Sequence, residues 1–150
     1  MNGYSYEKDD DGRIVLAEGD LHLERGVRNA SAQLKAGGVF RHDADDGGHL
    51  IGSRFGGSGE LDNLIAQNRF INRSAYKTLE NTWANKLEHG NDVHVEIEPY
   101  YQENTWRPHA IIGKYTITDQ EGRKQEEFFS LTNENLNKEE FELPEEADDI

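Results

Sequence analysis

The sequence has 150 residues, the usual size of a single compact domain with one buried core. It contains no cysteine, which excludes thiolate catalysis, thiolate metal sites and disulfide bonds and leaves oxygen and nitrogen as metal ligands. No apolar run approaches the roughly 18 residues of a membrane-spanning helix, and the acidic N-terminus does not resemble a signal peptide. We therefore expect a soluble chain with no membrane segment, whose export has to depend on parts outside this sequence.

The formal net charge of −14 argues against nucleic-acid binding, because proteins that hold phosphate backbones usually carry a basic surface. The charge is unevenly distributed, since residues 1–11 carry −3 and residues 126–150 carry −9, whereas residues 12–125 carry only −2. Charges are screened over about 8 Å at physiological salt. We therefore expect that a positive cleft can still form around a local cluster of basic side chains, Arg54, Arg69, Arg73 and Lys77.

The first predicted element is a β-hairpin. Its strands contain residues 4–6 and 14–16, and the Asp11-Gly12 pair between them tolerates the positive φ angles of a tight turn. Residues 19–36 show no sustained period and predict no particular element. Residues 37–59 contain eight glycines, well above the usual share of about 7%. This density indicates that the main chain approaches another group closely.

The clearest predicted element is a helix over residues 74–88, with Ser74 as its N-cap and Gly90 as its stop. Its apolar positions recur every four residues and predict one buried stripe of Ala75, Leu79, Trp83 and Leu87. Strands are predicted at 93–97, 110–117 and 128–131. We predict an α+β fold with an antiparallel sheet packed against one long helix. The domain spans residues 1–132, and an acidic, frayed or extended tail follows at 133–150.

One histidine has the surroundings of a catalyst. His49 stands between a glycine pair and an apolar dipeptide, so we expect it at the end of a strand and aimed into a cleft. An imidazole with a pKa of about 6.5 can accept a proton from water near neutral pH, as a general base does. Asp46 is a candidate to orient the ring or its strand. Taken alone, a histidine in a glycine-rich loop is more often a turn or surface residue.

An asparagine and a glutamate supply the oxygen atoms that a hard cation prefers. Asn72 lies just before the predicted helix, and Glu80 lies eight residues further on. If the helix reaches back to Asn72, Glu80 lies about 80° from it around the axis, so both share one side of the helix. Magnesium keeps much of its water and needs few direct protein ligands. Singly, Asn72 is by default a helix cap and Glu80 an exposed helix charge.

A family resemblance connects these residues. The stretches that carry it are Asp45 to Gly57, Asp62-Asn63-Leu64-Ile65-Ala66-Gln67, Asn72-Arg73, and Tyr76 to Glu80. Together they resemble the DNA/RNA non-specific endonucleases of the ββα-metal (His-Me finger) superfamily, especially the branch found as C-terminal toxin domains of bacterial polymorphic and LXG-type secreted toxins. The resemblance spans about Tyr4 to Phe129, and it implies a ββα-metal core.

The resemblance also implies roles for individual residues. His49 matches the general base, Asn72 the direct ligand of Mg²⁺ (or Mn²⁺), and Glu80 the water-mediated metal partner. Asn63 and Gln67 match positions that line or brace the site. Many relatives have Asp-Arg-Gly-His where this chain has Asp46-Gly47-Gly48-His49, so a phosphate-contacting arginine is missing at residue 47. Arg54 and Arg73 are the candidates to supply that charge.

The resulting hypothesis is a metal-dependent endonuclease that hydrolyses DNA and/or RNA, acting as a toxin domain delivered into a target bacterial cell. Such a domain implies a cognate immunity protein as a second partner. The alternative is a non-enzymatic acidic binding protein, an immunity factor or nucleic-acid mimic, on a nuclease-like frame. The net charge favours this alternative, whereas the intact set of His49, Asn72 and Glu80 disfavours it.

The remaining histidines show no metal-ligand spacing and are interpreted as surface or strand residues. Glu96 and Glu98 alternate along a predicted strand and are interpreted as solvated side chains. Backbone contacts carry no base information, so the choice between DNA and RNA stays open.

Overall fold

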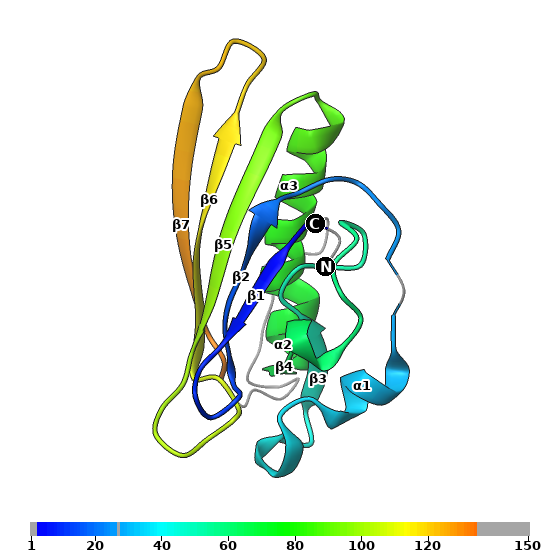
Figure 1. The fold of residues 1–150 in the computed structure, drawn as a ribbon, viewed down its shortest axis with the longest axis vertical. Coiled ribbons are helices and arrows are strands. Elements are labelled where there is room, and N and C mark those ends of the chain that lie inside the picture. Colours follow the sequence, from blue (N-terminus) through cyan, green and yellow to red (C-terminus); the bar gives the residue numbers. More distant parts are fainter. Residues whose placement is uncertain (1–2, 27, 135–150) are drawn as a thin grey trace.

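The computed structural model describes residues 3–26 and 28–134, so most of the predicted acidic tail lies outside the described residues. A five-stranded antiparallel sheet, in the order β1-β2-β5-β6-β7, packs against one long helix, α3, and a two-stranded sheet of β3 and β4 lies beside the helix (Figure 1). The predicted α+β fold is confirmed. Among the described residues, no helix is both long enough and apolar enough to cross a membrane.

The elements follow one another along the chain in a single series. Their bounds are β1 Ser5–Lys8, β2 Ile14–Asp20, α1 Ala30–Lys35, η1 Gly38–Phe40, β3 Asp45–His49, η2 Leu61–Asn63, β4 Leu64–Asn68, α2 Arg69–Ile71, η3 Asn72–Tyr76, α3 Lys77–Glu88, β5 Asp92–Tyr100, β6 Ala110–Thr118 and β7 Lys124–Thr132.

The N-terminal hairpin is confirmed as β1 and β2, with Gly12 at φ +85° in the turn between them. Strand β2 continues to Asp20 and pairs with β5, which places the hairpin at one side of the large sheet. The segment without a clear sequence period also contains helix α1. The side chain of Asn29 caps this helix by accepting a hydrogen bond from the amide of Ala32.

The core lies between the large sheet and α3. Val93, Val95 and Ile97 alternate along β5 and are buried on the face that meets the helix. Trp83 is fully buried at the centre, with edge-on contacts to the rings of Tyr76 and Tyr115 among others. The predicted apolar stripe is therefore right at its centre. Its outer members, Leu79 and Leu87, are only partly buried against this core.

The helix begins earlier than the sequence suggested. Its N-cap is Asn68, whose Oδ1 accepts hydrogen bonds from the amides of Phe70 and Ile71 at 3.1 and 3.4 Å. Ser74, predicted to be the cap, lies inside a π-helical turn, η3, that joins α2 to α3. The prediction was wrong because the true cap, Asn68, is also the last residue of a buried strand. From the sequence alone, an asparagine that caps a helix cannot be told from one that belongs to a strand. The end of the helix at Glu88 agrees with the prediction.

A buried ion pair ties the two sheets together. Arg107 donates to both carboxylate oxygens of Asp45, at 2.7 and 2.9 Å, and to the carbonyl of Asn133. Asn133 itself is buried, and its amide bonds with the main chain of Ala66, Asn68 and Pro108. The predicted boundary at 132/133 thus assigns to the tail a residue that is packed into the domain.

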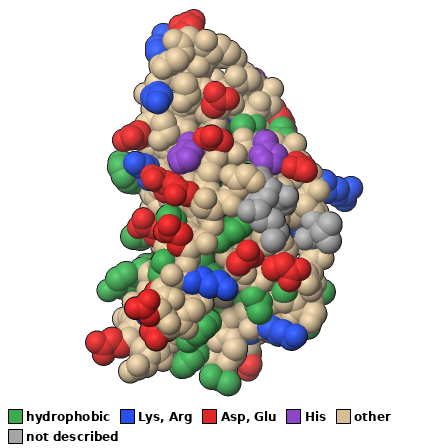
Figure 2. All heavy atoms as spheres, viewed as in Figure 1, with side chains coloured by type: hydrophobic (Ala, Val, Ile, Leu, Met, Phe, Trp, Pro, Cys, Tyr) green, Lys and Arg blue, Asp and Glu red, His purple; other side chains and the backbone are tan. Residues whose placement is uncertain are grey.

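The face of the large sheet that points away from α3 is strongly acidic. Figure 2 shows many acidic side chains on this side of the molecule, with histidines among them. The strand residues that alternate with the buried ones include Glu18, Asp20, His94, Glu96 and Glu98. Phe128, at 74% exposure, interrupts the charge on β7. We call this surface the outer sheet face.

Candidate active site

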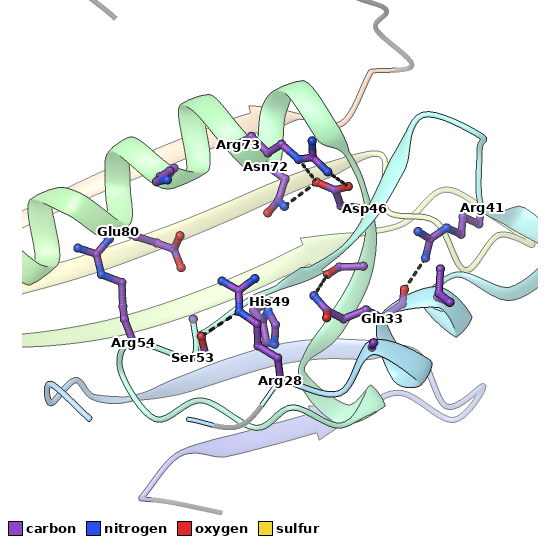
Figure 3. A pocket seen from close by; sticks show the side chains of 15 residues that line it. Arg28, Gln33, Arg41, Asp46, His49, Ser53, Arg54, Asn72, Arg73 and Glu80 are labelled. Carbon is purple, nitrogen blue, oxygen red and sulfur yellow. Dashed lines mark hydrogen bonds and ion pairs between the residues drawn. The ribbon is translucent and has the colours of Figure 1, made fainter. Parts of the chain in front are cut away.

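A cleft of about 750 Å³ opens between α1, the β3-β4 pair and the start of the long helix. It brings together residues that are distant in sequence: Arg28, Gln33, Arg41, Asp46, His49, Ser53, Arg54, Asn72, Arg73, Lys77 and Glu80 all line it (Figure 3). His49, Asn72 and Glu80 therefore share one cavity, together with the predicted residues Asp46, Arg54, Arg73 and Lys77.

His49 is the last residue of β3, as expected from its sequence context. Its side chain is 9% exposed, and its Nε2 atom has no hydrogen-bond partner among the described residues. Burial, together with the positive charge of Arg28, lowers the pKa of His49 from 6.5 to about 4. The imidazole is therefore neutral at physiological pH and available to accept a proton.

The two glycines before His49 are required by close packing. A Cβ atom at Gly47 would overlap the backbone of Gln33 in α1, whose side-chain amide donates to the Gly47 carbonyl at 3.2 Å. A Cβ at Gly48 would overlap Oε1 of Gln67 and lie 3.1 Å from Oδ1 of Asn72. Residue 47 thus has no room for an arginine side chain, because α1 occupies the space where that side chain would begin.

Asn72 has its amide orientation fixed by Asp46. Nδ2 of Asn72 donates to the Asp46 carboxylate at 3.0 Å, and the guanidinium of Arg73 binds the same carboxylate through two hydrogen bonds of 2.9 Å (Figure 3). A carboxylate only accepts hydrogen bonds, so it holds the amide nitrogen and leaves Oδ1 of Asn72 turned away towards Gly48. Asp46 was expected to orient His49 or its strand, but its bonds go to Asn72 and Arg73 instead.

Glu80 points into the same cleft from the first turn of α3 (Figure 3). Its carboxylate packs against Gly52, where a Cβ atom would overlap it. Burial raises the pKa of Glu80 from 4.5 to about 7, although Arg54, Arg28 and Lys77 act in the opposite direction. Because ionisation of this carboxyl group is unfavourable, a nearby cation would strongly stabilise its charged form.

Two residues predicted to line or brace the site are buried behind the cleft. Asn63 is fully buried, and its side chain holds the backbone of Ile51 and Ser58 through three hydrogen bonds of 2.8–3.0 Å. Its role is therefore to brace the loop after His49, and a contact with substrate is excluded by its burial. Gln67 is also fully buried, directly behind Gly48.

Basic side chains dominate the rim. Five of them line the cleft, Arg28, Arg41, Arg54, Arg73 and Lys77, against the two carboxylates of Asp46 and Glu80. The local charge is thus +3 in a chain of −14. Arg69, which was expected here, instead donates to the carbonyl of Asp43.

Sequence reasoning missed two of these basic residues, Arg28 and Arg41. Arg28 lies beside His49 and donates to Oγ of Ser53 at 3.4 Å (Figure 3). Arg41 donates to the backbone of Gln33 and Asp45. One local signal could have pointed to Arg28. It directly precedes Asn29, a residue type that often caps a helix, so it lies at the start of α1.

The residues around Asn72 fit a hydrated divalent cation. Both polar atoms of the buried Gln67 amide lack a hydrogen-bond partner among the described residues, and unpaired buried amides are costly. Oδ1 of Asn72 and the Glu80 carboxylate are hard oxygen donors of the kind that magnesium and manganese prefer. These oxygen atoms are therefore better explained as ligands of a cation than as side chains that only pack within the protein.

Comparison with known proteins places the chain in a family. Residues 1–119 match the family described as DNA/RNA non-specific endonuclease. The chain is 41% identical over 122 residues to "Type VII secretion system protein EssD" of Staphylococcus aureus strain USA300 and of strain NCTC 8325. The match covers 77% of this chain but only 20% of that protein, so the chain spans about a fifth of the relative's length.

Solved structures share the fold. NucA from Streptococcus agalactiae, determined with no metal bound, superposes with a TM-score of 0.69 at 20% identity, over 87% of this chain and 70% of that one. The Sda1 nuclease, solved with a bound zinc ion, gives a TM-score of 0.67 at 17% identity, over 87% and 74%. The expected core, a two-stranded pair of β3 and β4 followed by a long helix, is present in the chain. By the match over most of its length, the chain belongs to the DNA/RNA non-specific endonuclease family.

Proposed function

We propose that this protein is a divalent-metal-dependent endonuclease that hydrolyses nucleic-acid phosphodiesters without sequence preference. One observation carries the proposal: a neutral imidazole, an outward amide oxygen and a carboxylate converge in a single cleft rimmed by five cationic side chains. The cleft also answers the objection from net charge, because the acidity lies elsewhere on the molecule.

Substrate binding rests on the cationic rim. Arg28, Arg54 and Lys77 line the cleft around His49 and Glu80, where they can hold phosphate oxygens. Arg28 stands beside His49, so it is the candidate to supply the charge that Gly47 lacks. Arg73 is committed to Asp46 through two hydrogen bonds, so its main part is to hold Asp46 and, through it, Asn72. Contacts of this kind carry no base information, which supports non-specific cleavage.

His49 acts as the general base. It accepts a proton from a water molecule as that oxygen bonds to phosphorus, and the bond from phosphorus to the leaving oxygen breaks on the opposite side. Asn72 and Glu80 would hold the cation, Mg²⁺ or Mn²⁺, with the Gln67 amide behind them. When bound, this ion neutralises charge on the phosphate and stabilises the departing oxygen. By holding Nδ2 of Asn72, Asp46 would leave Oδ1 available to the ion.

The similarity to a type VII secretion system protein supports a role as a toxin domain of a secreted effector. In that role the domain acts inside a target bacterial cell, and a cognate immunity protein restrains it in the producer. The acidic outer sheet face offers such a partner a surface away from the cleft.

A plasmid-nicking assay tests the activity. We expect cleavage with Mg²⁺ or Mn²⁺, no cleavage in EDTA, and no cleavage by His49→Ala. His42→Ala is the matched control, because His42 is an exposed histidine that does not line the cleft, and it should cleave normally. Nicking that persists in EDTA and in His49→Ala would indicate a contaminant. An absence of cleavage with every metal would favour the acidic binding protein instead.

The toxin role needs its own test. Induced expression in the cytoplasm of a bacterium should stop growth and degrade nucleic acid, whereas His49→Ala should be tolerated at the same protein level. Equal growth inhibition by both proteins would show that the toxicity does not depend on cleavage. That result would refute the toxin proposal and leave the proposed enzymatic activity unaffected.

A further inference from the structure

A second group of metal-ligating side chains lies on the outer sheet face, far in the fold from the cleft. Glu18 on β2 and His94 and Glu96 on β5 each offer one ligand atom, and these three atoms lie within 4.8 Å of one another. Glu18 and Glu96 are direct partners in the pairing of β2 with β5. Two like charges in that position repel each other, and a shared cation would relieve the repulsion.

The histidine of this group has its ring orientation set by a fourth residue. Nδ1 of His94 is bonded to the carboxylate of Asp20 at 2.7 Å, and Asp20 is the strand partner of His94. A carboxylate accepts the Nδ1 proton, so in the neutral ring Nε2 carries the lone pair, and Nε2 faces Glu18 at 3.8 Å. Metal-binding histidines in proteins almost always donate their second nitrogen to a carboxylate or carbonyl in this way.

The ligand chemistry selects the metal. One imidazole and two carboxylates suit zinc, which takes nitrogen and oxygen ligands in tetrahedral geometry and keeps a fourth position for water. Tetrahedral zinc places ligand atoms about 3.3 Å apart, so these half-exposed side chains need to close by about 1 Å. One group competes, since Nζ of Lys114 on β6 lies 3.2 Å from the Glu96 carboxylate and has to release it.

We propose that Glu18, His94 and Glu96 form a zinc site that clamps the N-terminal hairpin to β5, with Asp20 as its positioning residue. The ligands come from two strands that pair only in the folded protein, so the ion stabilises the folded state. The site lies on the opposite side of the sheet from α3, which carries Glu80. It is therefore independent of the proposed catalytic cation, and neither proposal depends on the other.

Zinc titration by calorimetry tests the proposal in the full chain carrying Asn72→Ala, which removes the proposed catalytic ligand. We expect one zinc ion per chain and a rise in melting temperature. In that background, His94→Ala and Glu96→Gln should each weaken binding by about 10-fold or more, and Asp20→Asn by about 10-fold. His109→Ala is the matched control, an exposed histidine beside the same sheet, and it should bind as the parent does. Lys114→Met should tighten binding, because it removes the competing ammonium group.

Nitrogen-15 NMR of the imidazoles identifies the bound atom. Zinc should shift Nε2 of His94 and leave its Nδ1 protonated. The proposal is overturned if zinc binds no more tightly than millimolar, if His94→Ala and Glu96→Gln leave the affinity unchanged, or if the zinc shift appears on a different histidine. Because His94→Ala and Glu96→Gln lie outside the cleft, their nicking activity with Mg²⁺ should equal that of the wild type.

Discussion

Replacing Glu80 with glutamine should stabilise the metal-free protein at alkaline pH while abolishing its cation-dependent cleavage. The substitution keeps the shape of the side chain and removes its charge. Burial raises the pKa of Glu80 from 4.5 to about 7, so the ionised form is unfavourable in the folded protein. A group of this kind contributes full stability below its unfolded pKa and loses that contribution as the pH rises through about 7.

The size of the effect follows from the same shift. Each tenfold change in an ionisation equilibrium is worth about 1.4 kcal/mol, so a rise from 4.5 to about 7 corresponds to about 3 kcal/mol. Glu80 is only partly buried, so solvent screening reduces the effect to about 1–2 kcal/mol. In a domain of this size, that is a gain of about 2–8 °C in melting temperature.

Thermal unfolding in EDTA measures this gain at about pH 8.5 and at about pH 4, which is below the unfolded pKa of 4.5. The variant should melt higher than wild type at the alkaline pH and equally at the acidic pH, where the wild-type carboxyl is already protonated. Glu88→Gln is the control, because Glu88 is exposed on the same helix. A variant that melts at or below the wild-type temperature at pH 8.5 would show that the Glu80 carboxylate is not destabilising, and the physical account of the site would be wrong.

Four further outcomes are expected. His49→Ala should lower the cleavage rate by about 10²–10⁴-fold. Wild-type cleavage at saturating metal should persist down to about pH 5, because the pKa of about 4 keeps the His49 imidazole neutral. A cleavage rate that falls with an apparent pKa near 6.5 contradicts this. Asp46→Asn should raise the metal concentration for half-maximal cleavage by about 10–100-fold with a small change in melting temperature, because Asn72 loses its orienting partner; an unchanged metal dependence would remove Asp46 from the site. Gly47→Arg should destabilise the fold by about 1–3 kcal/mol in denaturant unfolding, because its Cβ meets the backbone of α1, and it should not increase DNA affinity. Asp45→Ala should cost about 3–5 kcal/mol, because it leaves the charge of Arg107 buried without its partner; urea unfolding that matches wild type would refute the importance of this pair.

The sequence predicted the elements whose signals are local. The hairpin at Gly12, the end of the helix at Glu88 and the alternating strand β5 depend on neighbouring residues, so each was placed correctly. Strand β4 was not predicted, because Gln67 and Asn68 are polar residues that the fold buries completely. Only tertiary partners, such as Asn133, explain why a polar segment lies in the interior.

The residues of the candidate site also divide into those with a local sequence signal and those that only the fold brings together. His49, Asn72 and Glu80 were found because their spacing is a property of the chain and of the family it resembles. The roles of Asp46 and Asn63 were placed less accurately, because a polar residue near a site can either face the cleft or hold the loop behind it. Arg28 and Arg41 were missed, since a positive rim is assembled from segments that meet only in three dimensions.

The bonds of Asn133 have a consequence for protein synthesis. The amide of Asn68, the residue that caps the helix bearing Asn72, donates to the side chain of Asn133, which lies 65 positions later in the chain. A ribosome has to translate every strand of the large sheet before this bond can form. A growing chain therefore contains all of its candidate catalytic residues well before this bond can fix the start of the helix that bears Asn72.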